Sequence, residues 1–315
     1  MKKILKKCWA WPWQLRRRGV LGINARNVRF LFSANPRRFY KDVDDKLRTK
    51  QICRSYGIPI PDLYAVIDRF GDLRHLETLI GPRNEFVIKP AAGAGGRGIT
   101  VITRRSGDLF YTARDESLTL DWLRYHFSTI LSGLYSLGGR LDRALIEQRI
   151  TPHSVFAPFC AYGTPDLRLI LYRRRLVMAM LRLPTLASRG RANLHQGAVG
   201  AGIDLASGRT FGGVCRNRPV DFHPDTAAPL AGLLLPHWEH TCDIAVRLAG
   251  ALGLGYLGVD LLLDEHHGPL VIEANARPGL AIQIANRRGL LDRRQRTFSE
   301  NVIKLAAALK EPIVV

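Results

Sequence analysis

Short apolar runs separated by polar turns recur along this chain, and the clearest pair lies near its C-terminal end. Leu257–Leu263 and Pro269–Ala274 are rich in β-favouring residues and flank the polar segment 264–268, so the pattern predicts an antiparallel hairpin. Other runs, bounded by glycine, proline or charged residues, predict strands at Leu63–Ile67, Phe86–Ile88, Ile99–Ile102, Ala144–Ile150 and on both sides of Arg173–Arg175. We therefore expect a fold built around β-sheets.

Apolar residues at helical spacing predict the helices that flank these sheets. A helix capped by Asp44 or Asp45 is expected to stop at Gly57, and one helix spans Leu118–Leu137 within a helical surface insertion over 104–143. Further helical segments are expected at Thr226–Gly253, Ala281–Asn286 and Phe298–Leu309.

Three oxygen-bearing side chains converge on one face of the predicted hairpin. If Asp264 pairs with Pro269, Asp260 lies opposite Glu273, and the two-residue period of a strand puts Asn275 on the same face. Carboxylate and amide oxygens suit Mg²⁺, whereas like charges facing each other destabilise a sheet unless a cation lies between them. We therefore predict a metal site; the alternative is an exposed cross-strand pair.

The composition is globular but strongly basic. The 315 residues contain 47 Lys and Arg against 27 Asp and Glu, with a formal net charge of +20. This excess predicts attraction to an anionic partner such as nucleic acid, an acidic membrane surface or a phosphorylated ligand. The five cysteines are scattered without a CxxC pair, which argues against a disulfide framework and a zinc site. No apolar run approaches the roughly 18 residues of a transmembrane helix, and the N-terminus is a poor secretion signal, so a cytoplasmic protein is expected.

Residues 1–43 form a basic arm that is rich in aromatic residues. Trp9, Trp11 and Trp13 lie among lysines and arginines, a composition typical of a segment that rests on an anionic membrane surface. The alternative is a helical arm that packs on its own domain or on a partner. Peripheral membrane association through this arm is therefore one of two expectations, and the absence of a basic and aromatic platform elsewhere argues against nucleic acid.

A glycine-rich loop joins two of the predicted strands. Phe86–Ile88 leads into Lys89, a strand resumes at Ile99, and between them lie Gly93, Gly95, Gly96 and Gly98. This order of strand, loop and strand differs from the P-loop and the dinucleotide fingerprint, in which a helix follows the loop. Because glycines let backbone N–H groups close over phosphate oxygens, the segment predicts nucleotide binding; a mobile hairpin connection is the alternative.

Two further groups of polar residues are candidates for an anion site. Asp166 and Arg168 share one face of a predicted strand, and Arg182 lies in the next strand. The loop over 189–202 carries the donors Arg191, Asn193 and His195. A loop with this many donors suggests anion binding, and the alternative is a solvated turn.

Seven motifs, taken in order, resemble the ATP-grasp superfamily. They are DDK at 44–46, FVIKPAAGAGGRGI at 86–99, LIEQRI at 145–150, DLR at 166–168, RANLHQGA at 191–198, GVD at 258–260 and EANARPGL at 273–280. Within the superfamily they are most similar to the α-L-glutamate ligase-like branch, related to enzymes that add glutamate to a ribosomal protein. The resemblance implies an α/β (α+β) ATP-grasp fold, with two mostly antiparallel sheet subdomains that clasp ATP.

The resemblance also implies a role for each candidate residue. ATP phosphates would be held by Lys46, Lys89, Gly93, Gly95, Gly96 and Gly98, and adenine by Glu147, Gln148, Arg149 and Ile150. Mg²⁺, or Mn²⁺ in its place, would be held by Asp260, Glu273 and Asn275. The transferred phosphoryl group would meet Arg168, Arg191 and Asn193, and substrate would meet Asp166, Arg182, His195 and Arg277.

The resemblance predicts three segments and one reaction. The segments are the basic arm 1–43, a lid subdomain 44–148 and a C-terminal subdomain 149–315. The reaction is ATP- and Mg²⁺-dependent joining of a carboxylate donor, glutamate or another acid, to an amine acceptor through an acyl phosphate. The alternatives are a kinase acting on a small acidic acceptor, and a membrane- or nucleic-acid-associated ATP-binding protein with vestigial catalysis.

Overall fold

The computed structural model describes residues 11–291 except 94, 137, 161 and 162. The predicted helix over 298–309 and Trp9 lie outside the described residues. Contacts within the chain define two compact units. Unit 1 holds the described residues up to Tyr40, Pro152–Pro269 and the described residues from Glu273 onward, and unit 2 holds Lys41–Thr151 with Leu270–Ile272.

Unit 2 is built on an antiparallel sheet, which in the described residues has six strands in the order β1-β6-β2-β3-β4-β5. The strands at 63–67, 86–88, 99–102 and 144–150 are confirmed with small shifts of their ends, whereas β4 and β5 were not predicted. The bounds are β1 (Leu63–Ile67), β2 (Phe86–Pro90), β3 (Thr100–Ser106), β4 (Leu109–Thr112), β5 (Ser117–Leu118) and β6 (Ala144–Glu147).

The helices of unit 2 begin and end at recognisable signals. Asp45, one of the two predicted caps, caps α6 (Lys46–Ser55), because its side chain accepts hydrogen bonds from the backbone N–H groups of Leu47 and Arg48. The helical segments are α5 (Lys41–Asp44), α6 (Lys46–Ser55), η3 (Phe70–His75), α7 (Leu76–Ile80) and α8 (Leu120–Leu131).

The single helix predicted over Leu118–Leu137 is too long. Strand β5 occupies its first residue, Thr119 caps α8, and the helix ends at Leu131. Gly133 follows with φ of +83°, and a Cβ at this position would lie 2.1 Å from the Arg140 carbonyl oxygen. The chain therefore turns before the glycine pair at 138–139 that was expected to stop the helix.

Helix α8 belongs to the hydrophobic core of unit 2. Leu123, Phe127 and Ile130 are fully buried, and they join the cluster that contains Phe86 and Phe110 of the sheet. The rings of Phe86 and Phe110 meet edge to face with centroids 5.9 Å apart. The segment predicted as a surface insertion thus supplies part of the core.

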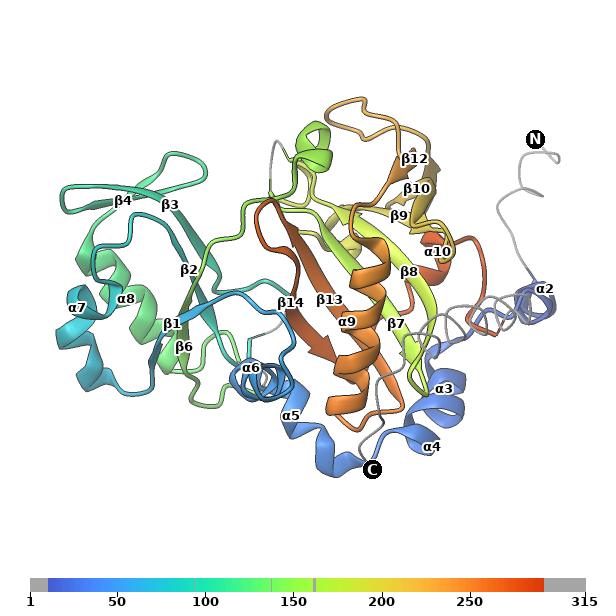
Figure 1. Ribbon diagram of the computed structural model, residues 1–315, viewed down its shortest axis with the longest axis horizontal. Helices are drawn as coiled ribbons and strands as arrows, with labels where there is room; N and C mark the ends of the chain where they lie inside the picture. Colours follow the sequence, from blue (N-terminus) through green and yellow to red (C-terminus); the bar gives the residue numbers. More distant parts are fainter. Residues whose placement is uncertain (1–10, 94, 137, 161–162, 292–315) are drawn as a thin grey trace. The chain divides into compact units, whose positions relative to one another are not determined.

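Unit 1 contains an eight-stranded sheet in its described residues, ordered β11-β10-β9-β8-β7-β13-β14 with β12 paired to β10 (Figure 1). The predicted hairpin is confirmed as β13 and β14, and the two strands flanking 173–175 as β7 and β8. The bounds are β7 (Asp166–Tyr172), β8 (Arg175–Leu183), β9 (Val199–Ile203), β10 (Arg209–Cys215), β11 (Arg218–Val220), β12 (Ala231–Leu234), β13 (Tyr256–Asp264) and β14 (Gly268–Asn275).

The helix predicted over Thr226–Gly253 was drawn too long. Strand β12 occupies Ala231–Leu234, and helix α9 covers only Trp238–Ala251. Pro236 separates the two elements, and the backbone of His237 adopts a φ of +54° immediately before the helix. The helix at 281–286 is confirmed as α10 (Ile282–Ala285).

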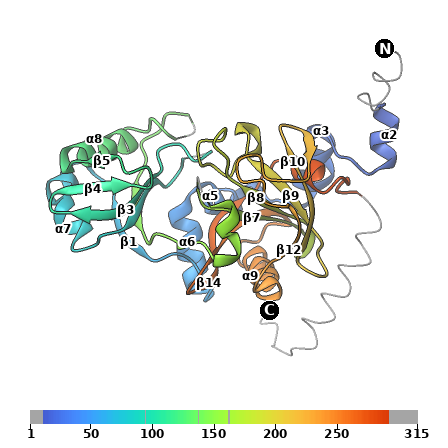
Figure 2. The same cartoon turned by 90° about the horizontal axis from the view of Figure 1, so that it is seen from above.

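Both faces of the unit 1 sheet are covered. Helix α9 packs on one face, and the N-terminal helices with α10 cover the other (Figures 1 and 2). On the second face Leu21, Phe30 and Leu31 pack against Met178 and Tyr256, among others. The N-terminal elements are α2 (Pro12–Arg17), α3 (Ile23–Arg26), a π-helical turn η1 (Asn27–Leu31), α4 (Phe32–Ala34) and a 3-10 turn η2 (Arg37–Phe39). No helix in the described part of the chain has the length and apolarity needed to cross a membrane.

Hydrogen bonds between distant segments attach the N-terminal helices to the sheet. The buried Asn35 side chain accepts from the Tyr256 N–H at 2.7 Å and donates to the Tyr256 carbonyl at 2.7 Å and the Ala276 carbonyl at 3.2 Å. The Gln283 side chain bonds both backbone groups of Leu21, at 2.9 and 3.0 Å. Asn35 therefore joins the first residue of β13 to the residue that follows β14.

Replacing Phe127 by alanine should destabilise the protein by about 3–5 kcal/mol, because it leaves a cavity in the core of unit 2. Tyr125→Ala on the exposed face of the same helix should change stability by less than about 0.5 kcal/mol. Urea denaturation followed by circular dichroism measures both. Equal effects of the two substitutions would show that α8 is not part of the core.

Candidate functional site

Unit 2 carries a buried cluster of two lysines and one glutamate. Lys89 at the end of β2 approaches Glu147 of β6, with 2.7 Å between Nζ and Oε2, and Lys50 of α6 approaches the same oxygen at 3.3 Å. All three side chains are less than 10% exposed. Lys50 also donates to the Pro61 carbonyl at 3.1 Å.

The charges of this cluster do not cancel. Burial, reinforced by the neighbouring charge of Lys89, lowers the pKa of Lys50 to about 8, and Glu147 only partly opposes this shift. The second carboxylate oxygen of Glu147, Oε1, is buried without a hydrogen-bond partner. Two lysine side chains face one carboxylate, so the cluster has more positive than negative groups and one unpartnered acceptor oxygen.

The glycine loop follows β2 directly, and its glycines are sterically required at two positions. A Cβ on Gly93 would lie 2.3 Å from Cγ of Pro90, and one on Gly98, where φ is +74°, would lie 2.5 Å from the Tyr135 ring. Lys46, the first residue of α6, donates from Nζ to the Gly93 carbonyl at 2.7 Å. The structure therefore brings Lys46 to the loop, as the predicted phosphate site requires.

The residues after β6 bond to the residues that precede β1 and β2. Gln148 accepts a hydrogen bond from the Asp62 N–H at 3.1 Å and donates its own N–H to the Asp62 carbonyl at 2.8 Å. Arg149 pairs with Glu85 at 2.6 Å, and Ile150 is buried. This segment lies directly beyond Glu147, but only Glu147 belongs to the buried charge cluster.

In unit 1 two arginines and two aspartates lie on three neighbouring strands, β7, β8 and β13. The β-sheet register pairs Arg168 with Asp260 and Asp166 with Arg182, which places all four on one face. Arg168 donates hydrogen bonds to both carboxylate oxygens of Asp260, and Arg182 donates to both of Asp166. Arg182 also approaches Oδ2 of Asp260 at 2.9 Å. Two guanidinium groups thus neutralise two carboxylates within the sheet.

The surroundings shift the pKa values of the two aspartates in opposite directions. Burial raises the pKa of Asp166 to about 6; the charge of Asp260 adds to the rise and Arg182 opposes it. Burial would also raise the pKa of Asp260, but Arg168 and Arg182 outweigh it and hold the pKa below its ordinary value. Of the two aspartates, Asp260 is therefore the one whose ionised form the surroundings favour.

Of the three donors predicted in the loop 189–202, one bonds within the loop and two are exposed. Asn193 caps a short 3-10 turn, η5 (Leu194–Gln196), by accepting from the His195 N–H at 3.0 Å, while Arg191 and His195 are exposed. Within the described residues no hydrogen bond or ion pair joins these three to Arg168. The structure therefore brings Asp166, Arg168, Arg182 and Asp260 together but not the loop donors, and the phosphoryl role of Arg191 and Asn193 stays a prediction.

The other two predicted metal ligands lie on β14. Glu273 and Asn275 are half-buried, and the amide nitrogen of Asn275 has no hydrogen-bond partner. The register that would set Glu273 opposite Asp260 remains a prediction. In the described chain no group of three or more His, Cys, Asp and Glu side chains is arranged to hold a metal. The guanidinium of Arg277 lies 4.5 Å from the Tyr40 ring centroid, so this predicted substrate residue packs on an aromatic face.

Sequence reasoning missed two buried cations. Lys50 lies three residues after Leu47 and three before Cys53, so it occupies the apolar stripe of α6, and that position was the signal for its burial. Arg26 is also buried, beside Tyr256, but its helix is short and, apart from the adjacent Asn27, its partners lie more than 200 residues away. No local pattern could identify it.

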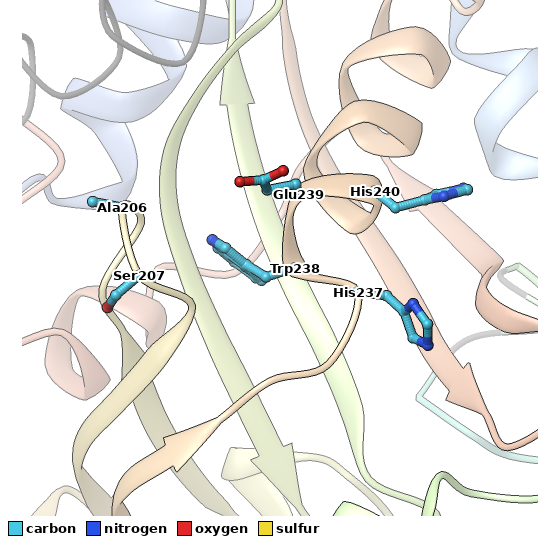
Figure 3. A pocket seen from close by; sticks show the side chains of 6 residues that line it. All are labelled: Ala206, Ser207, His237, Trp238, Glu239 and His240. Atoms are coloured by element: carbon cyan, nitrogen blue, oxygen red, sulfur yellow. The ribbon is translucent and has the colours of Figure 1, made fainter. Parts of the chain in front are cut away.

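A cavity of about 420 Å³ opens at the start of α9 (Figure 3). It is lined by Ala206, Ser207, His237, Trp238, Glu239 and His240. The Trp238 indole lies beside it and donates to the Leu205 carbonyl at 3.0 Å. None of the predicted site residues lines this cavity.

Comparison with known proteins gives one broad family match. A family model described as sugar-transfer associated ATP-grasp matches residues 25–299. A probable alpha-L-glutamate ligase of Xanthomonas campestris pv. campestris (strain B100) is 28% identical over 238 residues, which are 75% of this chain and 58% of that protein. A probable alpha-L-glutamate ligase of Xanthomonas oryzae pv. oryzae (strain MAFF 311018) is 27% identical over 251 residues, 79% of this chain and 62% of that protein.

This chain therefore spans about three fifths of the length of the curated relatives it matches. Among solved structures, the ATP-grasp ligase PsnB in complex with a minimal precursor aligns with a TM-score of 0.43 and 15% identity. That alignment covers 86% of this chain and 63% of PsnB.

Lys50→Met should remove a pH dependence of stability that the wild type shows. Because the folded-state pKa of Lys50 is lowered from 10.5 to about 8, the unfolded chain takes up the proton first as pH falls through this window. Wild-type stability should therefore drop relative to Lys50→Met by about 3 kcal/mol between these pH values and stay level below them. Urea denaturation at a series of pH values measures the difference.

Arg54→Met is the matched control, since it removes a positive charge from the exposed face of the same helix. It should keep the wild-type pH dependence. A parallel pH dependence in Lys50→Met and the wild type would contradict the burial of Lys50.

Proposed function

Because this chain belongs to the sugar-transfer associated ATP-grasp family, we propose that it joins a carboxylate donor to an amine acceptor at the expense of ATP. The observation that carries the proposal is the buried Lys50, Lys89 and Glu147 cluster, whose surplus positive charge lies at the base of a glycine loop. Such a site matches the charge of ATP phosphates. Weak similarity to probable glutamate ligases favours an amino acid, glutamate first, as one of the substrates.

The proposed reaction has two steps. An oxygen of the donor carboxylate attacks the γ-phosphorus of ATP, and the bond to the bridging oxygen breaks, giving an acyl phosphate and ADP. The amine nitrogen then attacks the acyl carbon, the carbon–oxygen bond to phosphate breaks, and the nitrogen loses a proton. No side-chain nucleophile is needed, so the protein contributes positioning and charge neutralisation.

The lysines and backbone groups of unit 2 hold ATP in this proposal. Lys46 and Lys89 contact the phosphates, and N–H groups of the glycine loop close over them. The unpartnered Oε1 of Glu147 accepts a hydrogen bond from the adenine amino group, and the chain over 148–150 lines the base. Lys50 neutralises Glu147 and keeps Lys89 available for phosphate.

Mg²⁺ fits the donor set of unit 1, and Mn²⁺ would fit the same oxygens. Three guanidinium N–H contacts occupy about three of the four lone-pair positions of Asp260, which leaves one on Oδ1. The unpartnered Asn275 amide can offer its oxygen after a rotation of the amide, and Glu273 completes the set. When bound, the metal supplies charge neutralisation of the phosphate oxygens.

The remaining charged residues of unit 1 serve the substrates. Arg168 stabilises the transferred phosphoryl group while it orients Asp260, and Arg191 and Asn193 add donors from their loop. Asp166, Arg182, His195 and the exposed Arg277 are the residues proposed to meet the donor and acceptor. Their excess of positive charge favours an acidic substrate.

Glu273→Gln should lower ADP formation at least 100-fold, because loss of a direct metal ligand exceeds the roughly 10- to 100-fold cost of losing a supporting residue. The thermal unfolding midpoint should stay within about 2 °C of the wild type, since the side chain keeps its size. A coupled ADP assay with Mg²⁺ and a panel of amino acids measures turnover. Glu265→Gln, in the exposed turn of the same hairpin, should retain wild-type activity; unchanged turnover in Glu273→Gln would refute the metal assignment.

We infer in addition that the N-terminal helices rest on an anionic membrane. Ile23, Val28 and Phe32 are 64%, 64% and 70% exposed, and they lie five and four residues apart along α3, η1 and α4. The exposed arginines nearby are Arg29, Arg37 and Arg38. An apolar stripe flanked by arginine suits the interface of an acidic bilayer.

The triple variant Ile23→Ser, Val28→Ser, Phe32→Ser should bind vesicles containing phosphatidylglycerol at least about tenfold more weakly, because three apolar side chains no longer insert. Cosedimentation with these vesicles and with neutral phosphatidylcholine vesicles measures the partition. Leu134→Ser with Leu141→Ser, two exposed leucines of unit 2, should leave binding intact. Equal binding by the triple variant and wild type would contradict the membrane proposal.

A further inference from the structure

Arg26 is a buried cation without an anionic partner. Its side chain lies on α3 and the residue is only 7% exposed. Among the described residues no carboxylate lies within ion-pair distance of its guanidinium. In the described part of the chain the other buried or nearly buried positive charges, Lys50, Lys89, Arg168 and Arg182, each have a carboxylate at close range. An isolated buried charge is costly unless a ligand or partner compensates it.

The guanidinium is held in place by neutral groups and keeps donors in reserve. Nε donates to the Asn27 side chain at 2.9 Å, and Nη1 donates to the Pro278 carbonyl at 2.8 Å. A guanidinium has five N–H donors; these two bonds fix its orientation, a third N–H faces the Tyr256 side chain, and two are left for a further acceptor. Pro278 lies three residues after Asn275, in the loop that follows β14.

The Tyr256 hydroxyl lies beside Arg26. It is buried, and no acceptor for its proton is found among the described residues. Burial raises the pKa of Tyr256, and the positive charge of Arg26, a hydrogen bond from the Arg26 side chain and the charge of Arg168 partly offset the rise. Tyr256 itself is fixed by its ring contact with Phe30, at 5.3 Å between centroids, and by the bonds of its backbone to Asn35.

The sheet register places this group beside the charged network of unit 1. Residues 256, 258 and 260 alternate onto one face of β13, and Tyr256 and Asp260 pair with Tyr172 and Arg168 of β7. Between them Gly258 is kept without a side chain, since a Cβ there would lie 2.6 Å from Pro278. Arg26, Tyr256 and Arg168 therefore follow one another along a single face.

We propose that Arg26 and the Tyr256 hydroxyl bind an oxyanion of the substrate, a carboxylate or a phosphate group, next to the Arg168 and Asp260 pair. The proposal rests on the ligase function inferred above and names a residue that selects its acidic substrate. The oxyanion supplies the missing countercharge and accepts both from the free N–H groups of Arg26 and from the hydroxyl. Asn35 and Pro278 hold the two donors in position before the ligand arrives.

The test measures anion binding by the full chain without requiring turnover. The thermal unfolding midpoint is recorded against increasing L-glutamate, inorganic phosphate and sodium chloride at equal ionic strength, with and without ADP and Mg²⁺. Wild type should be stabilised by glutamate or phosphate beyond the chloride effect. Arg26→Gln should need at least about tenfold more of that anion for the same shift, because a hydrogen bond to a charged group contributes about 1.5–3 kcal/mol.

Two further variants separate binding from structural support. Arg26→Lys should bind the anion better than Arg26→Gln, and Tyr256→Phe should weaken it severalfold while it keeps the ring packing. Arg29→Gln, which removes an exposed charge from the next turn, should match the wild type. A purely structural role of Arg26 would lower the starting midpoint of its variants yet leave the anion-induced shift unchanged, and that result would overturn the proposal.

Absence of a glutamate or phosphate effect on the wild type would overturn it equally. The arms with ADP and Mg²⁺ distinguish this proposal from the proposed function: a shift by ADP with none by either anion would refute only the Arg26 site. Absence of an ADP effect together with an anion shift that depends on Arg26 would refute the ligase and leave the anion site standing.

Discussion

The structure depends on pairing charges that the two sheets remove from water. The bidentate contact between Arg168 and Asp260 is the clearest case, because a buried carboxylate or guanidinium alone would be several kcal/mol too costly. Arg182 extends the same compensation to Asp166. These pairs fix which face of the sheet is polar. They also favour the ionised form of Asp260, as its proposed role as a metal ligand requires.

At two places buried positive charges are not fully paired with carboxylates, and both places suggest a bound anion. In unit 2 the two lysines exceed the single glutamate, and in unit 1 Arg26 has only neutral partners. A folded chain tolerates such an excess when a ligand of opposite charge shares the cost. The proposed nucleotide and oxyanion sites are therefore both inferred from a surplus of buried positive charge, one in each unit. The N-terminal helices belong to this account, because they both cover the sheet and deliver Arg26.

The sequence predicted features that depend on local patterns. The hairpin of β13 and β14 was evident from two apolar runs around a polar turn, and Asp45 was one of two caps expected for α6. Strands β9 and β10 were missed because glycines such as Gly202 lower strand propensity, although a Cβ there would lie 2.5 Å from Phe211. The pairing of Arg168 with Asp260 was not predicted, because it depends on the register of strands far apart in the sequence. The contacts of Arg26 with Pro278 and of Asn35 with Tyr256 were not predicted either, since they join segments more than 200 residues apart.

In the proposed ligase mechanism, the released phosphate carries one oxygen from the donor carboxylate. Glutamate labelled with ¹⁸O in its carboxylates, or any other donor found active, is incubated with ATP, Mg²⁺ and the amine acceptor, and the released phosphate is analysed by mass spectrometry. An acyl phosphate predicts one ¹⁸O in each phosphate formed and an amide product lighter by one water than its two substrates. Unlabelled phosphate, or a stable phosphorylated product without amide, would contradict the ligase mechanism.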